Sequence, residues 1–315
     1  MTPSDRRRNR VAVIDIGSNS IKLLVAERTA PNRPLTVLRE ATEETRIGAG
    51  ISRSIPELLE SGITPGLQAV RRLHDVACTH DPGEIALTAT SAVRDAVNRA
   101  EFAKRLEADL GLPLRILTGR EEARFIALGI RCDPDLQDLT DFYLFDLGGG
   151  SLETLAIEED HLRHVDSLPL GCVRLTEVFV PDREAPFSKM QQEQVANHVR
   201  SVLQNARFAF DLAANTRTVI TGGTAAIARL LAPSDESTHP SRVNRQQLDQ
   251  ILQDISPLPL ERRRRYPGLP PSRADVFPVA LVTLMTVLDM GRIGEFQHSF
   301  CNLRYGVAWE MLSAD

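Results

Sequence analysis

The sequence predicts a two-domain α/β protein built from a duplicated unit, and three observations support this prediction. The chain has 315 residues, which is more than one hydrophobic core usually serves. Stretches typical of strands alternate with stretches typical of helices, as in α/β folds. The pattern D-x-G-x-x-S occurs at 15–20 and again at 146–151, each time between two predicted strands. We expect domains at 1–132 and 133–315, with the last helix able to pack back on the first.

The individual elements follow from apolar spacing and turn formers. Short runs of β-branched and apolar residues that end at turn formers predict strands. These are 11–16, 21–26, 35–40, 84–90, 114–117, 142–146, 152–157 and 218–221. Apolar residues spaced by three or four predict helices. These are 66–79, 99–110, 118–130, 188–211, 222–231, 245–255, 275–290 and a last helix after Gly306. The polar segment 133–141 separates the two domains.

One predicted helix carries a specific start signal. Thr118 and Glu121 have the spacing of a capping box, in which Thr caps the helix and Glu reaches back to the cap. We therefore expect Glu121 to be occupied at the helix start.

Composition excludes several classes of protein. Hydrophobic residues make up 42% and charged residues 25% of the chain, as in ordinary globular proteins. The net charge of −5 and the pI near 5.9 offer no general attraction to nucleic acid or to an anionic membrane. Any polyanion must therefore meet local positive groups. We expect no nucleic-acid partner and no membrane partner, while a homodimer stays open.

Other features indicate a cytoplasmic protein. The arginine-rich N-terminus lacks the apolar region of a signal peptide. The longest apolar run, 276–288, is too short to span a bilayer, and we predict that it forms a core helix. The cysteines lie far apart without metal-ligand spacing, so we expect reduced core residues; they are Cys78, Cys132, Cys172 and Cys301. The histidines, including His161, His164 and His298, also lack ligand spacing and read as surface or structural residues.

The two repeated turns are the candidate phosphate-binding elements. Turns rich in Gly and Ser expose consecutive backbone N–H groups that can close on phosphate oxygens. The residues concerned are Gly17, Ser18, Asn19 and Ser20 in the first turn, and Gly148, Gly149, Gly150 and Ser151 in the second. Carboxylates beside bound phosphate require a cation between them, and Mg²⁺ is commonly held in this way. The candidate metal ligands are Asp15, Asp146 and Glu153. Alternatively, Asp15 and Asp146 only cap their own turns.

Positive side chains near these turns could neutralise further phosphate charge. Lys22 follows the first turn, and Arg94 follows the end of a predicted strand. The alternative for Arg94 is an ordinary surface salt bridge. The run Arg262–Arg265 could guide an anionic chain, or it could be a solvated loop or helix face.

Five ordered segments then resemble a known family. They are Asp15–Ser20, Ala89–Asp95, Gly119–Arg124, Asp146–Glu153 and Leu170–Leu175, and Thr221–Thr224, Arg273–Val276 and Leu303–Gly306 agree as well. In this order they are similar to motifs of the exopolyphosphatase and guanosine-pentaphosphate phosphatase family. The resemblance spans nearly the whole chain. It implies two ribonuclease-H-like domains of the actin, acetate kinase and hexokinase type around a central cleft.

The resemblance also implies roles for single residues. Glu122 matches the family's general base, and the capping box agrees because it leaves Glu122 free. Asp146 and Glu153 match the metal-associated pair, with Mg²⁺ as the cofactor, and Arg94 matches the phosphate-binding arginine. The implied reaction releases terminal orthophosphate from inorganic polyphosphate, with guanosine pentaphosphate as the alternative substrate. A non-catalytic sensor of guanosine alarmones and an ATP-dependent phosphotransferase are rival functions.

Three departures from the family pattern limit what carries over. Leu152 stands where the family usually has Thr, and Tyr305 replaces a usual Glu. Many members also have a further C-terminal helical region, which we do not expect here. A surface for long chains would then be absent.

Overall fold

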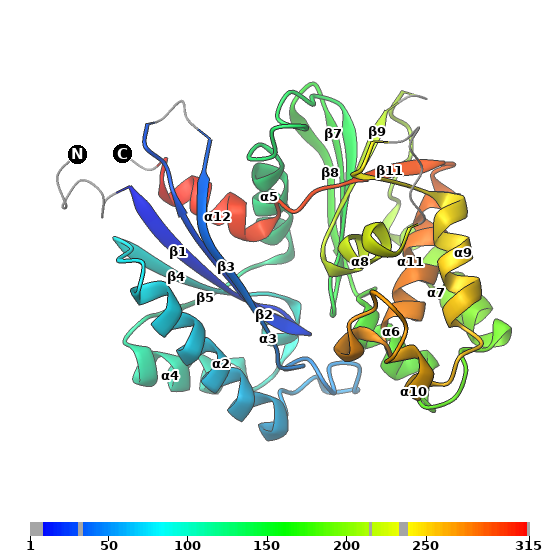
Figure 1. Cartoon of the computed structure of the whole chain (residues 1–315), viewed down its shortest axis with the longest axis horizontal. Coiled ribbons are helices and arrows are strands. Elements are labelled where there is room, and N and C mark those ends of the chain that lie inside the picture. The colour runs from blue at the N-terminus through cyan, green and yellow to red at the C-terminus, as the bar shows by residue number, and fades with distance from the viewer. Residues whose placement is uncertain (1–8, 31–33, 214–215, 233–238, 314–315) are drawn as a thin grey trace. The chain divides into compact units, whose positions relative to one another are not determined.

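The computed structural model describes residues 9–30, 34–213, 216–232 and 239–313 (Figure 1). The chain forms two compact units, one of Met1–Asp138 with Cys301–Asp315 and one of Leu139–Phe300. The boundary differs from the expected one, because residues 133–138 belong to the first unit. The segment from Cys301 also belongs to the first unit, in agreement with a last helix that packs back on the first domain. The arginines at positions 6, 7 and 8 lie outside the described residues. No helix in the described ranges combines the length and apolar character needed to cross a membrane.

The first unit contains a five-stranded sheet. Its strands are β1 (Arg10–Ile16), β2 (Ser20–Glu27), β3 (Thr36–Glu44), β4 (Glu84–Ala89) and β5 (Leu114–Ile116). The order is β3-β2-β1-β4-β5. Strand β2 is antiparallel to both of its neighbours, β1 and β3. Strand β4 is parallel to β1, and β5 is parallel to β4. Val13 and Ile14 of β1 are both fully buried although they point to opposite faces. The central strand is therefore covered on both sides, as in other α/β sheets.

Helices cover this sheet on both faces. They are α2 (Glu60–Cys78), α3 (Ser91–Asp95), α4 (Arg99–Leu110), α5 (Gly119–Ile130) and α12 (Leu303–Met311). One core joins Ile14 of β1 to Val70 of α2 and Phe102 of α4. On β1 and β2 lies α12, which also packs closely against α5 (Figure 1). Gly129 and Gly306 permit this packing, because a Cβ on either would collide with the backbone of the facing helix segment.

The second unit repeats this arrangement. Its strands are β6 (Phe142–Leu147), β7 (Leu152–Glu158), β8 (His161–Leu168), β9 (Arg217–Thr221), β10 (Arg242–Asn244) and β11 (Glu295–His298). The order is β10-β11-β9-β6-β7-β8. From β8 inward, the order β8-β7-β6-β9-β11 matches β3-β2-β1-β4-β5 of the first unit. The predicted duplication is confirmed.

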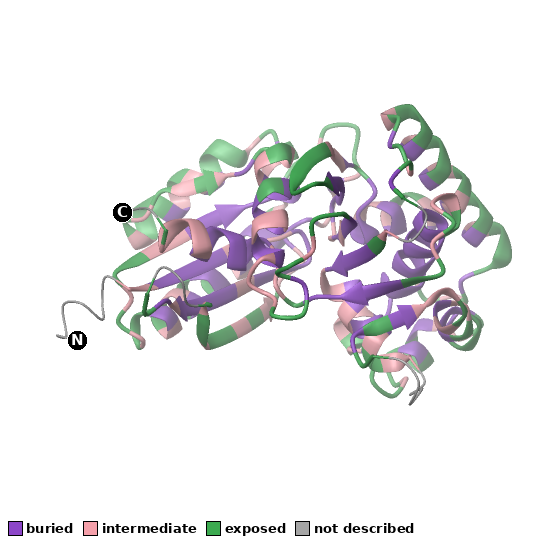
Figure 2. Cartoon of the chain, turned by 90° about the horizontal axis from the view of Figure 1, so that it is seen from above, coloured by how far each residue is buried: buried purple, intermediate pink, exposed green. Residues whose placement is uncertain are grey.

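Helices of the second unit bury an apolar core against this sheet. They are α6 (Cys172–Phe179), α7 (Lys189–Ala206), α8 (Gly223–Leu231), α9 (Arg245–Ile255), α10 (Leu260–Arg263), the 3₁₀ turn η1 (Pro271–Arg273) and α11 (Phe277–Met290). Every residue of α11 from Phe277 to Leu288 is buried, which confirms the predicted core helix. Figure 2 shows the central strands of each sheet as mostly buried.

Candidate active site

The two repeated turns have the same backbone hydrogen bond. Gly17 N–H donates to the Ser20 carbonyl at 3.1 Å, and Gly148 N–H donates to the Ser151 carbonyl at 3.0 Å. The turns join β1 to β2 and β6 to β7, which are equivalent strands of the two sheets. The repeat seen in the sequence is therefore a repeat in structure.

Neighbouring segments hold the carbonyl groups of both turns. In the first turn, Gly48 N–H donates to the Ser18 carbonyl at 2.8 Å. In the second, Val173 N–H at the start of α6 donates to the Gly149 carbonyl at 2.8 Å. A trans peptide points its N–H opposite to its C=O. The N–H groups that follow these carbonyls therefore point away from the holding segments, as an anion-binding turn requires.

The segment that starts α6 fixes the second turn. Gly171 packs so closely on the turn that a Cβ there would overlap the backbone of Gly149 and Gly150. Arg174 Nε donates to the Gly150 carbonyl at 3.0 Å, and Cys172 N–H donates to a further carbonyl of the turn. Helix α6 was not among the predicted elements, although its sequence belongs to one of the matching motifs. The glycine at position 171 is the sequence feature that could have indicated this close packing on the second turn.

Two carboxylates face each other beside the second turn. Asp146 of β6 and Glu153 of β7 are register partners, so their side chains lie on one face of the sheet. Glu153 is only 1% exposed, and Ser167 Oγ donates to its Oε1 at 2.7 Å. Asp146 Oδ1 lies against the start of α8, 2.5 Å from where a Cβ on Gly222 would be. Two like charges in this position favour a bound cation.

The first unit has a different pair at the equivalent position. Asp15 of β1 is the register partner of Lys22 of β2, so a carboxylate lies opposite an ammonium group. In the described parts of the chain, no group of three or more His, Cys, Asp or Glu residues could hold a metal. Asp146 and Glu153 fit Mg²⁺ as a pair, because this ion commonly takes its other ligands from water and phosphate oxygens. Asp15 fits a metal less well.

A buried threonine stands beside the aspartate in each unit. Thr88 of β4 is the register partner of Asp15, and Thr221 of β9 is the register partner of Asp146. The Thr221 side-chain oxygen is buried and has no hydrogen-bond partner within the described residues. Neither threonine was among the residues predicted for the site. Their positions at strand ends, each before a helix, were the available signal.

The structure brings Glu122 and Arg94 together. Glu122 lies in the first turn of α5 and is 6% exposed, and Arg94 lies at the end of α3. Arg94 Nη1 donates to Glu122 Oε2 at 2.6 Å and to the Leu117 carbonyl at 3.1 Å. The charge-assisted bond fixes the orientation of this carboxylate.

The capping box is confirmed and occupies the neighbouring glutamate. Glu121 N–H donates to Thr118 Oγ1 at 3.2 Å, and Thr118 N–H donates to Glu121 Oε2 at 2.9 Å. Arg115 also donates to Glu121 at 2.9 Å. The bond from Arg115, together with those from Thr118, lowers the pKa of Glu121 to about 2. Of the two adjacent glutamates, Glu121 therefore has a structural role.

The arginine run is divided between two environments. Arg263 is 1% exposed and donates to the carbonyls of Arg183, Ala185 and Ala274, so it is a structural residue. The expectation of a continuous anion guide or a fully solvated segment was wrong at this position, because the carbonyls of three loop residues need a donor. The other three arginines of the run are exposed.

Other expectations have mixed outcomes. His298 is buried, which confirms a structural residue, while His161 is exposed as expected of a surface residue. All four cysteines are free, but only Cys172 is buried, and the expectation of a core position was wrong for the exposed Cys78. Cys78 lies at the end of α2, where its side chain faces outward.

Fold and site together define a class of protein. Two ribonuclease-H-like units, each with a glycine- or serine-rich turn between its first two strands, characterise the actin-like group of folds. The Ppx/GppA phosphatase family matches residues 24–315, and the chain belongs to this family. It is therefore an enzyme, a phosphoanhydride hydrolase. The predicted family and fold are confirmed.

Solved structures agree with this fold. An exopolyphosphatase-like protein is 24% identical with a TM-score of 0.85, covering 96% of this chain and 97% of that one. The PPX-GPPA enzyme of Aquifex aeolicus is 25% identical with a TM-score of 0.75, at 96% and 99% coverage. An exopolyphosphatase from Cytophaga hutchinsonii is 21% identical with a TM-score of 0.83, at 96% and 97% coverage.

Proposed function

We propose that the enzyme hydrolyses the terminal phosphoanhydride bond of inorganic polyphosphate and releases orthophosphate. The observation that carries this proposal is Glu122, a nearly buried carboxylate that Arg94 holds at 2.6 Å. A carboxylate fixed in this way can accept a proton from water as the water attacks phosphorus.

The repeated turns would bind the phosphate oxygens through their backbone N–H groups, with Lys22 and Arg94 as further positive groups. Asp146 and Glu153 would hold Mg²⁺, and the bound ion would neutralise negative charge on the phosphates. Ser167 supports this role by fixing one oxygen of Glu153. Arg94 would have two tasks, to orient Glu122 and to stabilise charge on the transferred phosphoryl group.

Polyphosphate is our first choice of substrate because two similar solved structures are described as an exopolyphosphatase and an exopolyphosphatase-like protein. The family description also covers guanosine pentaphosphate phosphatases, so guanosine pentaphosphate is the alternative. Orthophosphate release by purified protein, with the two substrates offered separately, tests the choice. Faster release from guanosine pentaphosphate would overturn it. Binding of guanosine alarmones without any release would instead indicate a sensor.

We further propose that the enzyme grips only the last few phosphates of a chain. The net charge is −5, and within the arginine run Arg263 is buried while Arg265 pairs with Glu261 at 2.5 Å. Few positive side chains of this run are then available to contact a long polyanion at several successive phosphates. A gel time course on long polyphosphate should show gradual shortening of the whole population. Full-length chains that persist beside orthophosphate would contradict this proposal.

The acidic balance offers no general attraction to nucleic acid or to an anionic membrane, which supports a cytoplasmic enzyme without either partner. Whether it forms a homodimer stays a prediction that sedimentation can test.

A further inference from the structure

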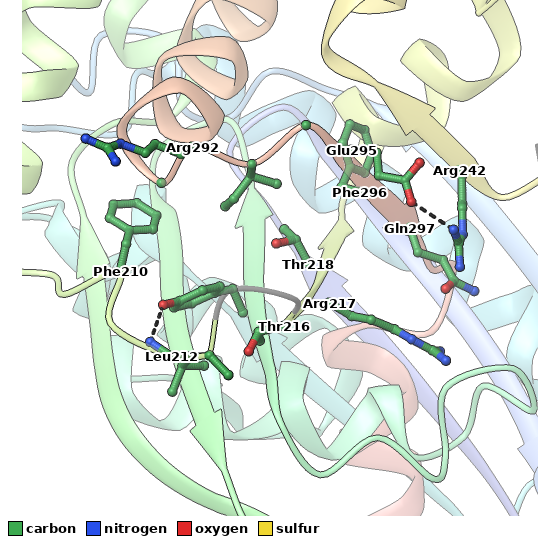
Figure 3. A pocket seen from close by; sticks show the side chains of 15 residues that line it. Phe210, Leu212, Thr216, Arg217, Thr218, Arg242, Arg292, Glu295, Phe296 and Gln297 are labelled. Carbon is green, nitrogen blue, oxygen red and sulfur yellow. Dashed lines mark hydrogen bonds and ion pairs between the residues drawn. The ribbon is translucent and has the colours of Figure 1, made fainter.

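The second unit contains a pocket of about 720 Å³ at one end of its sheet (Figure 3). Tyr143 and Thr218, near the first residues of β6 and β9, line it, together with the turn that follows α11. Asp146 lies three residues further along β6 than Tyr143, which corresponds to roughly 10 Å of extended strand. The pocket is therefore separate from the second turn. Its volume is in the range that holds small organic ligands.

Two buried hydroxyl groups have hydrogen-bonding capacity to spare. Thr218 is 4% exposed, and its Oγ1 has no partner within the described residues. Tyr143, its register partner on β6, is 5% exposed. Leu212 N–H donates to the Tyr143 hydroxyl at 2.7 Å, so the hydroxyl hydrogen is left to donate elsewhere. A buried hydroxyl without a hydrogen-bond partner destabilises the protein, and a ligand that forms this hydrogen bond would remove the cost.

Aromatic rings form the wall beside these hydroxyls. The ring of Phe210 lies 5.7 Å from that of Tyr143 at an interplanar angle of 55°. A Cβ added to Gly294, in the turn after α11, would meet no atom within 4 Å, so there is open space beside this turn. A flat ring can lie against an aromatic wall of this kind.

Arginines stand at the rim. Arg217 is exposed and makes no hydrogen bond or ion pair with any residue of the described part of the chain. Arg242 pairs with Glu295 at 2.8 Å. Figure 3 shows Arg217 and Arg242 on the same side of the pocket, next to Gln297, which is the register partner of Arg242. Guanidinium groups in this position favour a phosphate or carboxylate.

We propose that this pocket binds a small phosphate monoester that carries a flat ring, as a mononucleotide does. The ring would lie against Phe210, with its polar substituents on Thr218 and Tyr143, and the phosphate would meet Arg217. This site is independent of the catalytic proposal, because it uses none of the residues assigned to hydrolysis.

Calorimetric titration with AMP tests the proposal, since AMP has no phosphoanhydride bond to cleave. Saturable binding is expected for AMP, with affinity lower by about tenfold or more for adenosine and for orthophosphate, each of which lacks one half of the ligand. Absence of saturable binding at millimolar AMP would overturn the proposal. The proposal would also be overturned if adenosine or orthophosphate bound as tightly as AMP.

Variants locate the bound AMP. Arg217→Ala and Thr218→Val should each weaken binding by about tenfold, because one removes a charged donor and the other a hydroxyl. Thr218→Val also removes a buried unpaired oxygen, so the fold should not lose stability. Arg200→Ala is the matched control, an exposed arginine of α7 away from the pocket. If Arg217→Ala binds AMP like Arg200→Ala, or if Arg94→Ala abolishes binding, the site lies elsewhere.

Discussion

Replacing Glu122 with Gln removes the charge of the proposed base and keeps the shape of the side chain. The Gln carbonyl oxygen can still accept the bond from Arg94, which is 2.6 Å long in the native protein. Only the ionic part of this contact is lost, so we expect the free energy of unfolding to fall by about 1–2 kcal/mol. Removal of the whole partner from a buried pair would cost about 3–5 kcal/mol.

Turnover should fall much further than stability. General-base catalysis contributes on the order of 10²–10⁴ in rate, so Glu122→Gln should lower kcat by that factor. This loss corresponds to about 3–5 kcal/mol of the activation barrier. KM should change little, because the phosphate-binding groups are retained.

Steady-state orthophosphate release from polyphosphate measures the effect, together with the thermal midpoint of each protein. Glu121→Gln is the matched control one residue away. Gln can still complete the capping box with Thr118, so this variant loses only the bond with Arg115 and should keep near-native turnover. Turnover of Glu122→Gln within about threefold of the native enzyme would remove Glu122 from the mechanism.

Three further predictions concern the metal, a buried arginine and a buried histidine. Asp146→Asn and Glu153→Gln should each raise the Mg²⁺ concentration that gives half-maximal activity, and activity that survives full chelation of divalent metal would refute a metal role. Arg263→Ala should lower the free energy of unfolding by about 3–5 kcal/mol in urea, against less than about 0.5 kcal/mol for the exposed Arg264→Ala, and equal effects would contradict its structural role. Burial, and to a lesser extent the nearby Arg229, lowers the pKa of His298 from 6.5 to about 4. Between these two pH values the ring is neutral in the folded protein and protonated in the unfolded chain. Stability should therefore fall as the pH drops from 6.5 towards 4, by up to about 3 kcal/mol, and an unchanged slope in His298→Gln would exclude this cause.

Local features of the site could be predicted from the sequence because they depend on nearby residues. Both turns follow from Gly and Ser between two short strands, and the capping box needs only Thr118 and Glu121 at a fixed spacing. The repeated pattern also predicted the duplication, because the same turn occurs twice, each time between two predicted strands. Helix α4 ends at Leu110 as predicted, and Gly111 follows it in the left-handed conformation that glycine tolerates.

Tertiary contacts could not be predicted in this way. Arg94 and Glu122 are 28 positions apart, and only the packing of α3 near the start of α5 brings their charges together. Arg263 looked like its exposed neighbours in sequence, although it alone turns inward to three carbonyls.

Several element boundaries differ for physical reasons. Strand β8 (His161–Leu168) was missed because polar residues outnumber apolar ones in it and only Leu168 is buried. Helix α7 stops at Ala206 and not at 211, since Arg207 adopts a left-handed conformation. Helix α2 begins at Glu60 and continues through Pro65, and α12 begins at Leu303 and includes Gly306.

We propose that water attacks the terminal phosphorus of polyphosphate. Hydrolysis in ¹⁸O-labelled water, followed by mass spectrometry of the products, distinguishes this reaction from transfer to another acceptor. We expect each released orthophosphate to carry one ¹⁸O atom from water, and the shortened chain to carry none. Label in the shortened chain, or phosphate that leaves only in the presence of another acceptor, would contradict attack of water on the terminal phosphorus.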